Sequence, residues 1–360
     1  MKSPAITSIA ILSFASFTPL AHFAVAHDGH PHVDQSTDHH APSDKTFMTV
    51  VSVGQGAYSY ETVPGFGKIP DGSNLGPTHG GVVVDNEGLI YVSSDGPKAL
   101  CVFNPDGTFV KAMSPSIKGM HGMQIHTEGD KQYIYGAQLS GGKGISPRAI
   151  KLDLDGNVVM TIPNKATAEI PGGTRGLTGI AVAPDGSIFV SMGYGSNLIH
   201  KFDKAGKLLK SFGGRGQEKE KFITCHGVGI DTRFDSPRLL VCDREKRRLV
   251  HLDLEGNWIG EYATGLRRPC AVSFHGDYCA VAELEARVAV LDKEGNIVSL
   301  VGDNPNKAQW AKFPVKPAEQ KPGIFTAPHG LSFDKDGNLY VQDWNATGRI
   351  SKMKRVSTAD

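Results

Sequence analysis

The sequence is poor in features that stabilise small or metal-knuckle domains. It contains only five cysteines, at positions 101, 225, 242, 270 and 279, and no two have the CxxC spacing of a zinc knuckle or a redox motif. An odd number leaves at least one free thiol if all bridges are intramolecular, so disulfides and buried unpaired thiols both stay open. Helical periodicity is also sparse. The fold must therefore rest on packed strands.

An excess of charge of either sign is absent too. The chain has 38 basic and 37 acidic residues and a formal net charge of +1. We therefore expect neither nucleic acid nor an anionic membrane surface as a partner. What the chain does have is 43 glycines and 21 prolines, a composition that fits an all-β fold with many turns.

The N-terminus predicts export. Lys2 precedes an apolar run from Ala5 to Val25, and Ala24-Val25-Ala26 has the small-residue pattern of a cleavage site. Residues 1–26 are therefore predicted to be a signal peptide of a secreted or periplasmic protein. No later apolar run is as long, so we expect no membrane association after its removal.

A His-rich segment follows this leader. Residues 27–45 hold five histidines and almost no apolar side chains, which predicts a disordered tether; metal gathering is an alternative role. Residues 46–360 then remain for a single folded domain.

A repeat organises this domain. In APHGLSFDKDGNLYVQDW, residues 327–344, an apolar strand runs through a turn signal into a second, alternating strand, which is a β-hairpin pattern. Similar units begin at Thr78, Met120, Leu177, Cys225 and Pro269, and further strand pairs follow them at a period of about 40 to 60 residues. Six four-stranded repeats predict a six-bladed β-propeller.

The two ends of the domain predict how the ring closes. Residues 47–63 alternate like strands before the first repeat, whereas the sixth repeat stops soon after its third strand, RISKMKRV. An N-terminal strand should therefore complete the last blade, because it would cover edges that are otherwise exposed. The Pro- and Lys-rich residues 304–324 interrupt the period and are expected to cap one face.

Histidines recur where the innermost strands begin. The residue five places before the first residue of the hairpin turn is a histidine in the second, fourth and sixth repeats: His121, His226 and His329. In the first, third and fifth repeats it is Gly80, Thr178 and Cys270. Alternate blades of a six-fold ring lie about 120° apart, so these three imidazoles should converge on the axis. Three histidines with an open fourth position are typical of a catalytic zinc site.

These segments resemble a known family. The chain is similar to NHL-repeat six-bladed propellers and, within them, to the peptidyl-α-hydroxyglycine α-amidating lyases. The similarity runs over roughly residues 75–356 and is most specific in MHGMQI, GYGSN, CHGVGID with CDRE downstream, and APHGLSF. The resemblance implies a zinc ion on His121, His226 and His329, a catalytic Tyr194, and Arg244 beside it. The implied reaction is cleavage of a C–N bond in a hemiaminal-like substrate to an amide and an α-keto acid.

The chain also departs from this family. Asp95 stands where the family has an arginine that holds the substrate carboxylate, so either the substrate lacks that carboxylate or another cation binds it. Arg175, Arg267 and Arg268 precede innermost strands; of these we favour Arg268, and we expect Asp95→Arg to improve activity on α-hydroxyglycine compounds.

Gly330 replaces an aspartate of the family's calcium site, which leaves backbone carbonyls near Val82 and Met123 as candidate calcium ligands. No monooxygenase domain accompanies the propeller to make an α-hydroxyglycine substrate.

Three functions remain open from the sequence. They are a zinc lyase, a secreted binding propeller with a structural metal, and a metal-dependent hydrolase or lactonase on the same scaffold. In each enzymatic case we expect a monomer acting on a small-molecule or peptide substrate.

Overall fold

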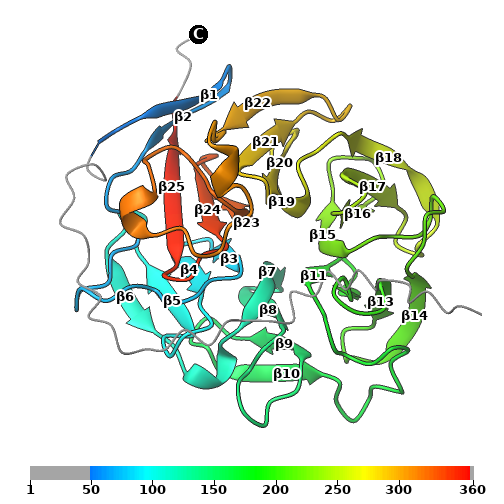
Figure 1. Ribbon diagram of the computed structural model, residues 1–360. Helices are drawn as coiled ribbons and strands as arrows, with labels where there is room; N and C mark the ends of the chain where they lie inside the picture. The colour runs from blue at the N-terminus through cyan, green and yellow to red at the C-terminus, as the bar shows by residue number, and fades with distance from the viewer. Residues whose placement is uncertain (1–48, 357–360) are drawn as a thin grey trace, which may run out of the picture. The chain divides into compact units, whose positions relative to one another are not determined.

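The computed structural model describes residues 49–356. The predicted signal peptide, residues 1–26, and the predicted tether, residues 27–45, lie outside them. Six antiparallel sheets surround a central axis in the described part (Figure 1). The prediction of an all-β six-bladed propeller is confirmed.

Five blades are four-stranded sheets whose strands follow one another in the chain. Blade 1 contains β3 (Val82–Val84), β4 (Ile90–Ser93), β5 (Leu100–Phe103) and β6 (Phe109–Ala112). Blade 2 contains β7 (Met120–Glu128), β8 (Lys131–Gln138), β9 (Arg148–Leu152) and β10 (Val158–Ile162), preceded by the short 3₁₀ helix η2 (Pro115–Ile117). Blade 3 contains β11 (Gly179–Val182), β12 (Ile188–Ser191), β13 (Leu198–Phe202) and β14 (Leu208–Gly213). Blade 4 contains β15 (Cys225–Asp231), β16 (Arg238–Asp243), β17 (Arg248–Leu252) and β18 (Trp258–Thr264), and blade 5 contains β19 (Pro269–His275), β20 (Tyr278–Glu283), β21 (Arg287–Leu291) and β22 (Ile297–Val301).

Blade 6 closes the ring with both ends of the chain. Its sheet has the order β1-β2-β25-β24-β23, which joins β1 (Ser52–Gln55) and β2 (Tyr58–Thr62) to β23 (Pro328–Phe333), β24 (Leu339–Asp343) and β25 (Arg349–Arg355). Tyr60 pairs with Arg355 in this sheet and is fully buried. The predicted N-terminal closure is confirmed, and it uses a two-stranded hairpin where the sequence indicated one strand.

The apolar core lies between blades. One cluster combines Val83 and Leu100 of blade 1 with Ile134 and Ile150 of blade 2, and the other clusters likewise bridge neighbouring sheets. An inner strand such as β3 is accordingly buried throughout, whereas an outer strand such as β6 alternates between half-buried and exposed residues. No blade covers its own faces, so the ring folds as one unit.

A recurring turn with aspartate at its start and asparagine at its end explains why the hairpins could be predicted from the sequence. The Asp334 carboxylate accepts from the backbone N–H of Asn338 at 2.9 Å and from its side-chain amide at 2.8 Å, and Gly337 supplies a φ of +77°. The same contacts recur in the turns Asp153–Asn157, Asp253–Asn257 and Asp292–Asn296. Asn and Asp side chains that bond their own turn favour such tight connections.

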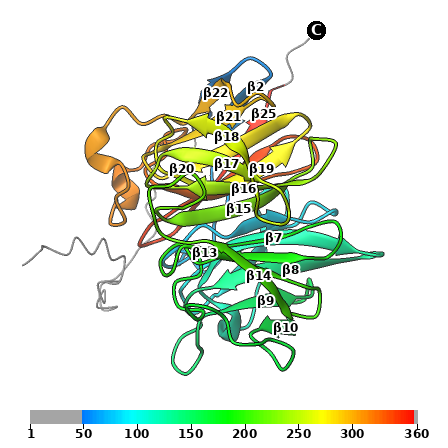
Figure 2. The same cartoon turned by 90° about the vertical axis from the view of Figure 1, so that its right-hand side faces the viewer.

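The insertion between blades 5 and 6 carries η3 (Lys307–Gln309) and η4 (Pro317–Glu319). Figure 2 shows it, in orange, standing out from one face of the ring. The Phe313 ring lies 4.9 Å from that of Trp344, which directly follows β24, and Arg267 lies over Trp310. The insertion therefore covers part of the face on which the innermost strands begin, in line with the expected cap on one face.

All five cysteines are buried and unpaired, so of the two alternatives left open by the sequence the structure has free thiols. No helix within residues 49–356 is long and apolar enough to cross a membrane.

Candidate metal centre

Three histidines occupy equivalent positions at the start of innermost strands. His121 is the second residue of β7, His226 of β15 and His329 of β23. In each strand the pairing register shifts at this point, between Met120 and Gly122 in β7 and at the matching places in β15 and β23. Such β-bulges redirect a side chain, and here they direct three imidazoles toward the axis.

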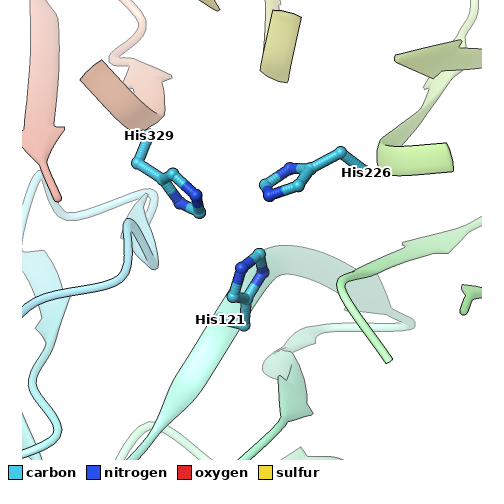
Figure 3. A group of neighbouring side chains, drawn as sticks. All are labelled: His121, His226 and His329. Carbon is cyan, nitrogen blue, oxygen red and sulfur yellow. The ribbon is translucent and has the colours of Figure 1, made fainter. Parts of the chain in front are cut away.

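The three imidazoles converge from three blades (Figure 3). Their ring centroids lie 4.7 Å (His121 to His226), 4.8 Å (His121 to His329) and 4.6 Å (His226 to His329) apart. One ring nitrogen from each lies within 4.8 Å of the others, and all three side chains are buried. The convergence predicted from alternate repeats is therefore present, and the cluster can hold a metal ion.

Backbone carbonyls of the intervening blades select the tautomer of each ligand. His121 Nδ1 lies 2.7 Å from the Thr178 carbonyl, and His226 Nδ1 lies 2.8 Å from the Cys270 carbonyl. His329 Nδ1 lies 2.5 Å from the carbonyl of His79. A carbonyl only accepts, so each Nδ1 carries the proton and each Nε2 keeps a lone pair for a metal. These donors fit zinc, which takes neutral imidazole nitrogen in three-histidine sites.

Burial also favours the neutral form of two of the ligands. Desolvation, and then the neighbouring imidazole charges, hold the pKa of His226 and of His329 well below the ordinary value. A lowered pKa favours the neutral imidazole that a metal requires.

The hydrogen-bond register corrects the assignment for the first blade. In blade 6 the residue after β24, Trp344, donates its N–H to the carbonyl two residues before His329, at Ala327. In blade 1 the same bond runs from Asp95 to Pro77 at 2.8 Å, which makes His79 the equivalent residue. The interpretation that Gly80 holds this position is wrong because Gly80, with a φ of +100°, is an extra residue inserted before the strand. Four of the six blades therefore place a histidine there.

Tyr194 lies against two of the ligands. Its hydroxyl is 3.1 Å from His121 Nε2 and 2.9 Å from His226 Nε2, on the side of the lone pairs. Arg244 donates to the same hydroxyl at 3.2 Å. Burial raises the pKa of Tyr194 to about 12, while the Arg244 charge opposes the rise. The phenol therefore holds its proton beside the site where a metal would bind.

Arg268 joins this group through a carboxylate. Glu245 accepts from Arg244 Nε at 2.9 Å and from Arg268 at 2.6 Å and 3.1 Å. Burial disfavours the charged carboxylate, but the Arg268 hydrogen bonds and the Arg244 charge hold the pKa of Glu245 below its ordinary value. Two guanidinium groups share one carboxylate, so the group carries a net positive charge next to Tyr194. Arg175, another loop arginine that precedes an innermost strand, is exposed.

Asp95 does not stand alone as an acid beside the site. Its carboxylate makes a short contact with Nδ1 of His79, and both side chains are mostly buried. The His79 ring centroid is 5.8 Å from that of His121 and 6.3 Å from that of His329. The side chains of His79 and Asp95 therefore occupy the place where the resemblance implies an arginine.

Other acids at the ends of second strands hold the loops that lead to the ligands. Asp343 Oδ1 accepts from the N–H groups of Thr326 and Ala327, just before His329, at 3.0 Å and 2.7 Å. Asp243 accepts in the same way from Ile223 ahead of His226. These two carboxylates therefore have a structural role. The orienting carbonyls of His79, Thr178 and Cys270, in contrast, have no signal in residue type and were missed.

An axial cavity of about 40 Å³ is lined by the three histidines and by the next residues of all six innermost strands, including Val82 and Met123. Among residues 49–356 no carboxylate lines it. A Cβ at Gly330 would lie 1.4 Å from the Gly80 carbonyl oxygen, so the inserted Gly80 leaves no room for an aspartate at this position. Only backbone carbonyls remain for calcium, and calcium binding stays a prediction.

No protein-family profile matches the chain. In sequence it is similar to NHL repeat-containing protein 3 of Mus musculus, with 28% identity over 225 residues, which is 58% of this chain and 63% of that protein. The chain thus spans less than two thirds of the length of this relative.

Solved structures share the fold. The chain is similar to a streptogramin B lyase at a TM-score of 0.53 and 14% identity, over 86% of this chain and 99% of that one. It is similar to virginiamycin B lyase from Staphylococcus aureus at 0.51 and 14%, over 78% and 96%, and to a protein assigned as a gluconolactonase at 0.53 and 14%, over 80% and 94%. The predicted NHL-type propeller is confirmed at the level of the fold, a scaffold that this chain shares with lyases and lactonases.

Proposed function

We propose that this protein is an exported, monomeric, zinc-dependent carbon–nitrogen lyase that cleaves a hemiaminal-like substrate to an amide and an α-keto acid. The observation that carries the proposal is the position of the Tyr194 hydroxyl, within hydrogen-bond distance of the metal-facing nitrogens of His121 and His226. A group that can donate and accept a proton thus lies beside the nitrogens that would hold a metal. Among the described residues the cluster has only three histidine ligands, which favours an open catalytic site over a closed structural one.

A zinc ion at this site would act as a Lewis acid that acidifies the substrate hydroxyl and stabilises negative charge on its oxygen. The substrate hydroxyl then loses its proton and becomes the new carbonyl, the C–N bond breaks, and the amide nitrogen takes up a proton. Tyr194 is placed to move that proton, because its hydroxyl both donates and accepts. Arg244 donates to the Tyr194 hydroxyl oxygen at 3.2 Å and would stabilise the phenolate form of this side chain.

The charges around the site support an anionic substrate. Neutral histidines leave the charge of a bound dication uncompensated, and Arg244 and Arg268 outweigh Glu245. This positive charge would attract a substrate carboxylate. Asp95 of the first blade carries the opposite sign of charge, but its carboxylate contacts His79.

The direct test combines two assays on one preparation. Purified protein should contain about one zinc per chain and release glyoxylate from a model α-hydroxyglycine compound, and chelation should abolish the release until zinc is restored. Zinc without glyoxylate release, together with turnover of a lactone, would contradict the lyase and favour a hydrolase. A mature N-terminus near residue 27 after expression in an exporting host would support the predicted export.

A further inference from the structure

The three carbonyls that orient the ligands are not held alike. Thr178 directly precedes β11, and its N–H bonds the Ser191 carbonyl at 2.8 Å; Cys270 lies within β19. His79, in contrast, stands before the inserted Gly80, and β3 begins only at Val82. The carbonyl that binds His329 therefore lies three residues before its strand, whereas those of Thr178 and Cys270 lie next to or within theirs.

This loop lies tight against His329. A Cβ on Gly80 would come within 2.6 Å of the His329 backbone carbon and 2.9 Å of its Nδ1. With so little clearance, any shift of the peptide between His79 and Gly80 changes the hydrogen bond that sets the His329 ring.

Two residues, Thr78 and Asp95, hold the loop from opposite sides. Thr78 is bound to blade 6, with its N–H 3.0 Å from the Asn345 carbonyl and its hydroxyl 2.7 Å from the Asp343 carbonyl. On the blade 1 side, the Asp95 carboxylate holds the His79 ring while the Asp95 N–H bonds Pro77. Asp95 thus ties both ends of the segment that carries the orienting carbonyl.

We propose that Asp95 and His79 form a positioning pair that holds the His79 carbonyl, and through it the imidazole of His329, in the metal-binding orientation. The metal readout of this inference rests on the proposed metal centre. It assigns Asp95 a task other than substrate binding: Asp95→Arg would remove the tether, so it should weaken zinc binding rather than improve activity.

The test measures zinc affinity by competition with a chelator for Asp95→Ala, His79→Ala and the double variant, with His126→Ala, a histidine away from the site, as the control. Both single variants should bind zinc about 10–100-fold more weakly, the usual effect of losing an outer-shell partner. The double variant should be no weaker than the singles, because both changes remove one interaction. Fully additive losses, or affinities equal to the control, would overturn the proposal.

A second readout needs no metal. In the imidazole N–H region of the NMR spectrum of metal-free protein, the variants should shift or broaden the Nδ1–H signal of His329 and leave those of His121 and His226 in place. Unchanged signals for all three would contradict the tether, whereas a chain that never binds zinc would contradict only the proposed function. If Asp95→Ala does not fold, Asp95→Asn keeps an acceptor for His79 and should show an intermediate loss; an affinity equal to that of the control would count against the pair.

Discussion

The hydroxyl of Tyr194 is the single group on which the proposed chemistry depends most. We expect Tyr194→Phe to keep the metal and the melting temperature but to lower kcat by about 100-fold or more, the range for a lost general acid or base. The phenyl ring can still pack under Arg244, whose guanidinium carbon lies 5.3 Å from the ring centroid. Steady-state kinetics on an α-hydroxyglycine compound measures the effect, with Tyr133→Phe as a control outside the site. Unchanged kcat in a zinc-loaded variant would make Tyr194 a packing residue.

Arg268 is expected to act on binding rather than on turnover. Removing it leaves Glu245 to neutralise Arg244 alone, so Arg268→Ala should raise KM for an anionic substrate about 10-fold or more, as expected for a charge-assisted hydrogen bond. A neutral analogue should be little affected. Arg267→Ala is the matched control, since Arg267 pairs with Asp303 and stacks on Trp310. Equal changes for charged and neutral substrates would exclude a role in carboxylate binding.

Single-residue features differed in how far the sequence revealed them. His121, His226 and His329 were predictable because they recur at one position of a repeat. The equivalent position in the first blade was assigned to Gly80 instead of His79, because one inserted glycine shifts the residue numbering by one. The hydrogen bond from the Asp95 N–H to the Pro77 carbonyl shows the correct register. The orienting carbonyls could not be predicted from the sequence, because every residue has a backbone carbonyl.

Among the secondary-structure elements, β2 has the clearest consequence for stability. Tyr60 is fully buried in the cluster that joins blades 5 and 6, together with Val301 and Met353. Tyr60→Ala should therefore reduce the free energy of unfolding by about 3–5 kcal/mol, as large aromatic truncations in cores do. Denaturant titration measures the change.

Two variants sharpen this prediction. Glu61→Ala, at the exposed neighbour, should change little, and Tyr60→Phe should retain or improve stability because the Tyr60 hydroxyl has no hydrogen-bond partner among residues 49–356. A Tyr60→Ala protein as stable as the Glu61→Ala control would show that N-terminal closure adds nothing to the ring.

The hairpins were predictable because turns such as Asp334–Asn338 are local, and their side chains bond within five residues. The second closing strand was not predictable, because β1 is the edge strand of its sheet within residues 49–356 and its residues are half-buried or exposed. Pairing of this kind leaves a weak apolar pattern in the sequence.

For the molecule as a whole, the repeat predicted the ring but does not choose the substrate. Proteins with this scaffold include lyases and a protein assigned as a gluconolactonase, so the fold alone does not select a reaction. The positive group around Glu245 and the pairing of Asp95 with His79 support the proposed anionic substrate. The sequence suggested Arg268 for binding a carboxylate, but it did not reveal that Asp95 has a partner.

The most direct test of the account is the metal content of the purified chain and of His121→Ala, His226→Ala and His329→Ala, measured by inductively coupled plasma mass spectrometry. The unsubstituted protein and the His126→Ala control should carry about one zinc per chain. Each of the three variants should lose it while retaining the β-sheet circular dichroism spectrum. Zinc near one per chain in all three variants would contradict a metal centre on these histidines.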